Sequence, residues 1–132
     1  MTALCIAGAG LAVQLAASAF TLSWTHTIEK TRWEEDWRIG PHSLVLVEAR
    51  VKGSGAGMEP PAGARLRGGF YVWRPELERE EVVLRRDPDA GDWRLCAGGE
   101  CAPIGTWLGS DADPVTLHPA AEDGCKKPAA TR

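Results

Sequence analysis

The sequence lacks a concentrated run of basic side chains, and this absence restricts the partners that the protein can bind. Its 132 residues include 15 Lys and Arg against 18 Asp and Glu, for a formal net charge of −3. Binding to a phosphate backbone requires several Lys or Arg on one face. We therefore expect no nucleic-acid partner. Phe and Tyr are also scarce, with 2 and 1 copies, whereas 6 Trp make the aromatic content unusual for one small domain.

Charge is missing from the N-terminal region. No charged side chain occurs from Thr2 to Ile28, and residues 4–20 are mostly aliphatic or small. An apolar run of about 15 residues is short for a membrane span, and residues 17–19 (Ala-Ser-Ala) form the small-x-small pattern of a signal-peptidase site. We expect a signal peptide over residues 1–19, cleaved after Ala19, and a periplasmic protein that contacts the membrane only through this segment. An uncleaved anchor and a buried strand or helix are the alternatives.

The 4 cysteines suit an oxidising compartment. Cys5 lies in the expected leader, which leaves Cys96, Cys101 and Cys125 in the exported part. Residues 98–99 are both Gly and allow a tight hairpin, so we expect a disulfide between Cys96 and Cys101. Cys125 is then unpaired, or it replaces one of these two partners.

Alternation of apolar and polar residues with a period of two indicates strands after the leader. It runs over residues 20–28 and 33–39, which form a predicted hairpin, and we expect further strands at 43–52, 69–74, 81–86, 92–96 and 115–118. No repeat or long helix-period segment follows the leader. The chain is therefore predicted to be all-β, a small antiparallel sandwich or barrel over residues 20–119 behind the N-terminal hydrophobic segment, with a flexible tail at 120–132.

A four-residue loop at 29–32 would place His26 directly opposite Glu35 on the apolar face of this hairpin. The pair is either a satisfied polar contact that fixes the register or, with Glu29 and Lys30, part of a patch that holds a ligand or partner. The same register pairs Ile28 with Trp33, Trp24 with Trp37, and Leu22 with Ile39.

A glycine-rich stretch at residues 52–64 contains Gly55, Gly57 and Met58 and then two prolines. It ends in neither the Lys-Ser/Thr of a phosphate loop nor a helix. The stretch is either a flexible connection or a recognition loop.

Residues 24–31 (WTHTIEKT), Glu35 and residues 53–61 (GSGAGMEPP) resemble the motifs of the bacterial domain of unknown function 1850 (DUF1850) family. The likeness runs from about residue 20 to 101. It implies a small exported protein associated with tripartite ATP-independent periplasmic (TRAP) transporters of the TAXI type, with the permease or its solute-binding protein as partner. The residues that match the family's motifs form our candidate ligand or partner site: His26, Glu29, Lys30, Thr31, Glu35, Gly55, Gly57 and Met58.

Three functions follow from these patterns. The first is an accessory or interaction protein beside a TAXI-type transporter, and the second is a small periplasmic solute-binding module in which Lys30 and His26 hold an organic acid. The third, an enzyme with His26 and Glu35 as a base and its orienting group, lacks a suitable nucleophile, so we expect no catalytic residues. The cysteine thiols and His118 match no zinc spacing, so we expect no metal or cofactor.

Overall fold

A computed structural model describes residues 2–25, 31–52, 62–87, 91–121 and 124–125. These residues form twelve strands and one short helix. The strands are β1 (Ala3–Gly8), β2 (Leu11–Ala16), β3 (Ala19–Thr25), β4 (Arg32–Ile39), β5 (Leu44–Lys52), β6 (Arg65–Arg67), β7 (Phe70–Trp73), β8 (Leu77–Arg79), β9 (Val82–Leu84), β10 (Arg94–Ala97), β11 (Glu100–Pro103) and β12 (Val115–Pro119), and the helix is α1 (Ile104–Leu108).

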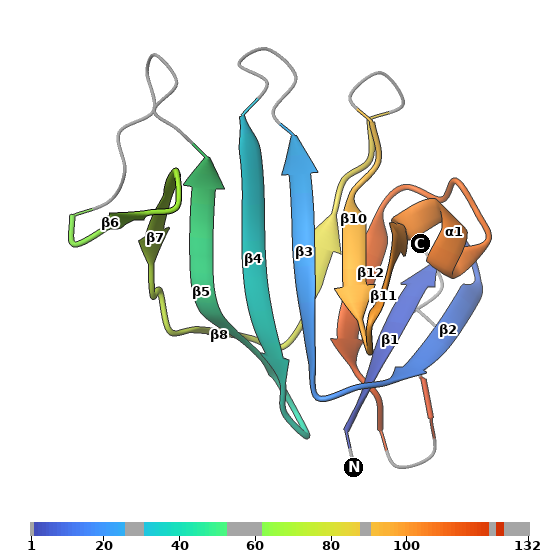
Figure 1. The fold of residues 1–132 in the computed structure, drawn as a ribbon. Coiled ribbons are helices and arrows are strands. Elements are labelled where there is room, and N and C mark those ends of the chain that lie inside the picture. The colour runs from blue at the N-terminus through green and yellow to red at the C-terminus, as the bar shows by residue number, and fades with distance from the viewer. Residues whose placement is uncertain (1, 26–30, 53–61, 88–90, 122–123, 126–132) are drawn as a thin grey trace.

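The strands are arranged in two antiparallel sheets (Figure 1). The small sheet has the order β2-β1-β12-β9, and the large sheet has the order β11-β10-β3-β4-β5-β7-β6, with β8 paired to β5. The small-sheet strands β1, β2 and β12 lie on the side of β3 and β10, whereas β5, β7 and β6 extend away on the other side. The fold is all-β and antiparallel, as predicted, and its described strands form two open sheets rather than a closed barrel.

One hydrophobic core lies between the sheets. Leu4 and Ile6 of β1 and Leu117 of β12 contribute to it from the small sheet, and Leu22 of β3 and Ile39 of β4 contribute from the large sheet. Alternate residues of a strand point to opposite faces, so the large sheet has an inner face toward this core and an outer face away from it. These two faces carry different kinds of side chain, which are described below.

The N-terminal residues differ from the expected leader. Residues 3–8 and 11–16 form a hairpin of the small sheet, and Leu4, Cys5 and Ile6 are fully buried. An uncharged aliphatic run has the same composition in a leader and in a core strand, so composition alone does not distinguish the two. Cleavage after Ala19 stays a prediction, and it would remove both strands. No helix in the described part of the chain is long and apolar enough to cross a membrane.

The cysteine pairing is confirmed for one disulfide and corrected for the other. Cys96 and Cys101 are bonded and face each other in the β10–β11 hairpin, whose turn residues Gly98 and Gly99 have φ of 59° and 85°. Cys125 is not unpaired and does not replace Cys96 or Cys101. It is bonded to Cys5 across a sequence separation of 120. The expected tail therefore contains a residue that is tied to the small sheet. Two disulfides are consistent with an exported protein.

The hairpin of β3 and β4 forms in a different register from the one predicted. Glu35 lies opposite Leu22, and Trp24 lies opposite Trp33. The pairing of His26 with Glu35 is therefore wrong. The observed register differs from the predicted one by four positions, and an even shift keeps every side chain on the same face. Alternation along the sequence cannot distinguish two such registers.

Candidate functional site

The two motif segments, residues 24–31 and 53–61, adjoin strand ends on the same side of the large sheet. β3 ends at Thr25, β4 begins opposite it at Arg32, and β5 ends at Lys52 beside Phe70. Figure 1 shows these three strand ends next to one another at the top of the sheet. We call this row of strand ends, formed by Thr25, Arg32 and Lys52, the loop edge. The sequence motifs at 24–31 and 53–61 both adjoin it.

The structure describes two of the predicted site residues. Thr31 is 6% exposed just before β4, and Glu35 is half-buried on the inner face of β4. The other predicted site residues lie outside the described residues: His26, Glu29, Lys30, Gly55, Gly57 and Met58. The structure therefore places the ends of the motif segments and Glu35, and it leaves the rest of the predicted site as a prediction.

Four half-buried tryptophans gather below the loop edge. The rings of Trp24 and Trp33 stack with centroids 6.0 Å apart, and Trp24 also contacts Trp93 at 4.7 Å. Trp73 meets Trp33 edge to face at 6.2 Å. Trp33 Nε1 is buried and has no hydrogen-bond acceptor among the described residues. We call Trp24, Trp33, Trp73 and Trp93 the tryptophan cluster.

Glu35 is on the same face of β4 as Trp33 and Trp37. Burial raises the pKa of Glu35, and the hydrogen bond that Trp37 Nε1 donates to Glu35 Oε1 at 3.1 Å opposes this only in part. A carboxyl group among aromatic rings resists ionisation because the surrounding dielectric is low. Only its neutral form can donate a hydrogen bond to a ligand or partner.

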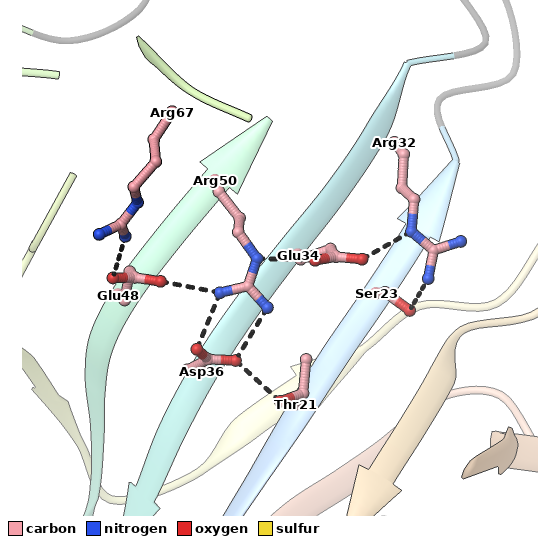
Figure 2. Close-up of polar contacts among 8 residues, drawn as sticks. All are labelled: Thr21, Ser23, Arg32, Glu34, Asp36, Glu48, Arg50 and Arg67. Carbon is pink, nitrogen blue, oxygen red and sulfur yellow. Dashed lines mark hydrogen bonds and ion pairs between the residues drawn. The ribbon is translucent and has the colours of Figure 1, made fainter. Parts of the chain in front are cut away.

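The outer face carries an ion-pair network centred on Arg50 (Figure 2). Arg50 Nε lies 2.6 Å from Glu34 Oε1, and Arg50 Nη1 lies 2.8 Å from Asp36 Oδ2 and 2.9 Å from Glu48 Oε2. The Arg50 side chain is only 20% exposed. Three carboxylates from two strands therefore share one guanidinium, whose fixed fork of donors suits this arrangement.

The network continues into the neighbouring strands. Arg32 Nε lies 2.7 Å from Glu34 Oε2, and Arg67 Nη2 of β6 lies 3.3 Å from Glu48 Oε1. Thr21 Oγ1 of β3 donates to Asp36 Oδ1 at 2.7 Å. The contacts join β3, β4, β5 and β6, the strands that carry the ends of both motif segments. We call the set Thr21, Ser23, Arg32, Glu34, Asp36, Glu48, Arg50 and Arg67 the outer network.

Electrostatics keep this network ionised. Burial by itself raises the pKa of Glu34 and of Asp36, but the arginines outweigh it and hold both pKa values below their usual range. For Glu34 the arginines are Arg32 and Arg50, and for Asp36 it is Arg50, with the hydrogen bond from Thr21 lowering the pKa further. The hydrogen bonds to Asp36 and Glu34 in turn raise the pKa of Arg50.

The outer network was not predicted from the sequence. The signal is present as Arg32, Glu34 and Asp36 alternating in β4 and as Glu48 and Arg50 in β5. Bringing these together requires the register between the strands, which shifts at a β-bulge between Asp36 and Trp37. A bulge of this kind has no sequence signature in this chain.

A cleft of about 910 Å³ lies at the opposite end of the molecule from the loop edge. The turn between β4 and β5 contributes His42 to it, β12 contributes His118, and Glu80 and Glu81 precede β9. None of the tryptophan cluster lines this cleft. Among the described residues no group of three or more His, Cys, Asp or Glu side chains is placed to hold a metal ion.

The fold and site define a two-sheet antiparallel β-protein whose sequence motifs adjoin one sheet edge above an aromatic cluster. The chain belongs to the DUF1850 family, because the family described as "Domain of unknown function (DUF1850)" matches residues 20–104. Searches of curated proteins and of solved structures find no match. The match spans β3 to β11, and β1, β2 and β12 of the small sheet lie outside it.

Proposed function

We propose that this chain is an exported, periplasmic accessory protein that binds a component of a TAXI-type TRAP transport system through the loop edge. The partner is the permease or its solute-binding protein, as the likeness to the DUF1850 family implies. The proposal depends on one observation above all. The first motif segment connects β3 to β4 and the second follows β5, and these three adjacent strand ends are held in register by backbone pairing and by the side chains of the outer network.

A fixed register matters for binding because a preorganised surface loses less conformational entropy when the partner docks. Arg32 begins β4 directly after the first motif segment, and it is tied through Glu34 to Arg50, two residues before β5 ends. The two attachment points are therefore linked by side chains as well as by the backbone pairing of β4 with β5. Loops on a rigid scaffold of this kind are the usual carriers of recognition.

The tryptophan cluster supports a binding role at the same edge. Trp and Arg are the residues that most often dominate binding energy at interfaces, and Trp24, Trp33 and Arg32 lie within the first two positions of the strand ends. The side-chain hydroxyls of Thr21 and Ser23 contact the outer network on the other face of the sheet from Glu35. A nucleophilic hydroxyl and the carboxyl that activates it must lie within hydrogen-bond reach of each other. Because these groups are on opposite faces of the sheet, the arrangement favours a binding role over catalysis.

Site-specific photo-crosslinking tests the proposal. A photoreactive amino acid replaces Thr25, which is exposed at the loop edge, and in a matched variant it replaces Arg79, which is exposed on β8 beside the opposite end of β5. Irradiation of intact envelopes should link the Thr25 variant, and not the Arg79 variant, to a TAXI-type permease or solute-binding protein. Equal or absent crosslinking at both positions would contradict the proposal. If the purified protein instead binds small organic acids in calorimetry, the solute-binding function replaces it.

A further inference from the structure

The four strands at the ends of the two sheet orders differ in how they are protected. β6 has the sequence Arg-Leu-Arg, and β9 is three residues long between Glu80-Glu81 and Arg85-Arg86. β11 ends in Pro103 and is bonded to β10 through the Cys96–Cys101 disulfide. Charge, shortness and proline are the devices by which proteins prevent edge strands from pairing with other chains. Each of these three edges has at least one of them.

The fourth edge, β2, has none of these devices. It is six residues long, Leu-Ala-Val-Gln-Leu-Ala, without charge or proline. Its pairing with β1 runs without a bulge from Ala3 opposite Ala16 to Gly8 opposite Leu11. Leu11 is 46% exposed. An edge that is regular, apolar and uncharged is a template for a further strand.

We propose that β2 pairs antiparallel with β2 of a second copy of this chain, so that the two small sheets form one continuous sheet across a two-fold axis. Leu11, Val13 and Leu15 point to the core side of β2, and Ala12, Gln14 and Ala16 point to the other side. In an antiparallel pair, residues opposite each other share a face. A register centred on Val13 places Leu11 opposite Leu15, and one centred on Gln14 places Val13 opposite Leu15, so the core-side residues face one another and Gln14 lies opposite Ala12 or a second Gln14.

The composition of β2 favours its own copy as the occupant. A two-fold axis places a strand against itself, so charges of one sign on that strand come close to like charges. β6 paired in this way would bring its arginines together, whereas β2 brings together only aliphatic, alanine and glutamine side chains. Val13 and Leu15 already pack against the core, and a second β2 would cover their remaining exposed surface.

Analytical ultracentrifugation of the full chain with its disulfides intact tests this pairing. The wild-type protein should sediment as a dimer, and the double variant Ala12→Lys/Ala16→Lys should sediment as a monomer. Both alanines are exposed, so the variant keeps the β1–β2 pairing, and its Trp near-ultraviolet circular dichroism should match that of the wild type. The control is Val83→Lys, which places the same charge on β9, the other edge of the same sheet, where Val83 is 49% exposed. It should stay dimeric.

Each other outcome overturns the proposal. A wild-type protein that is monomeric at all concentrations has no such pairing. A double variant that stays dimeric has a different interface, and a Val83→Lys monomer assigns that interface to β9. Mass spectrometry that finds the exported protein beginning at Phe20 removes β2 and the proposal together.

Discussion

Arg50 is the residue on which the outer face of the large sheet depends. It balances Glu34, Asp36 and Glu48, each within 2.9 Å. Removing one partner of a largely buried ion pair costs more than the pair contributes, because the remaining charges stay desolvated. Arg50 therefore adds a side-chain link between β4 and β5 to their backbone pairing.

Replacing Arg50 with Ala should lower the free energy of unfolding by about 2–3 kcal/mol, measured by urea denaturation. Arg65→Ala is the matched control, since Arg65 is an exposed arginine on the same face. It should change stability by less than about 0.5 kcal/mol. Equal effects of the two substitutions would mean that the network contributes nothing.

The same network predicts a pH dependence. The pKa values of Glu34 and Asp36 are lowered in the folded state, so the stability they contribute is complete above their unfolded values, near pH 4, and is lost as the pH falls through the folded values. The stability difference between wild type and Arg50→Ala should therefore shrink in acid. A difference that is constant with pH, measured by denaturation at several pH values, would contradict this assignment.

Glu35 should behave in the opposite way. Its pKa is raised in the folded state, so ionisation destabilises the fold as the pH rises through the folded value. Glu35→Gln keeps an acceptor for Trp37 Nε1 and should stabilise the protein near pH 7, with a smaller effect below about pH 4. Glu100→Gln, at an exposed position of β11, is the control and should have no effect at either pH. A Glu35→Gln protein less stable than wild type near pH 7 would show that the ionised carboxylate is needed.

Helix α1 is held to the end of the core by a pair of charged residues. Arg86 Nη2 lies 2.9 Å from Asp92 Oδ2, which also accepts a hydrogen bond from the backbone N–H of Gly105 at 2.8 Å. Arg86 donates to the carbonyls of Ser110 and Ala112 as well. These contacts connect the segments before β10 and after α1.

Gly105 leaves room for this contact, because a Cβ there would lie 2.8 Å from Arg86 Nη2 and 3.1 Å from Asp92 Oδ2. Gly105→Ala should therefore force the ion pair apart and lower the melting temperature, at a cost of about 1–2 kcal/mol. Thr106→Ala, at the next and exposed position of the helix, should leave the melting temperature unchanged. A stable Gly105→Ala protein would show that Arg86 can move without cost.

At the scale of elements, the sequence predicted the longer strands well. Alternation located β3, β4, β5, β7, β9, β10 and β12. It missed β6 (Arg-Leu-Arg) and β8 (Leu-Glu-Arg), which are short and mostly charged, and it assigned β1 and β2 to a leader because neither carries charge. Within the site, Glu35 was singled out correctly as a carboxyl on an apolar face. The predicted partner of Glu35, His26, was wrong. Registers that differ by an even number of residues place the same side chains on the same face, so alternation does not select between them.

At the scale of the whole molecule, the two disulfides close loops of very different length. Cys5–Cys125 spans 120 positions and joins the first strand to the C-terminal region, whereas Cys96–Cys101 spans 5 within one hairpin. A cross-link restricts the unfolded chain more when the loop it closes is longer. The first disulfide should therefore be the main covalent contribution to stability.

Replacing both Cys5 and Cys125 with Ser should lower the free energy of unfolding by about 4–5 kcal/mol, against about 2 kcal/mol for the double replacement of Cys96 and Cys101. Denaturant unfolding of the two double variants measures the difference directly. The reverse order would contradict the structural role assigned to the link between the two ends of the chain.

The central claim, that the loop edge binds a transporter component, is tested most directly by crosslinking with the chain's own lysines. The sequence has Lys30 and Lys52 in or beside the motif segments, and Lys126 and Lys127 near its C-terminus. The protein is captured from its native membranes after amine crosslinking, and the linked peptides are identified by mass spectrometry. We expect peptides of a TAXI-type permease or solute-binding protein linked to Lys30 or Lys52. Recovery of the protein alone, or partner peptides linked only to Lys126 and Lys127, would contradict the claim.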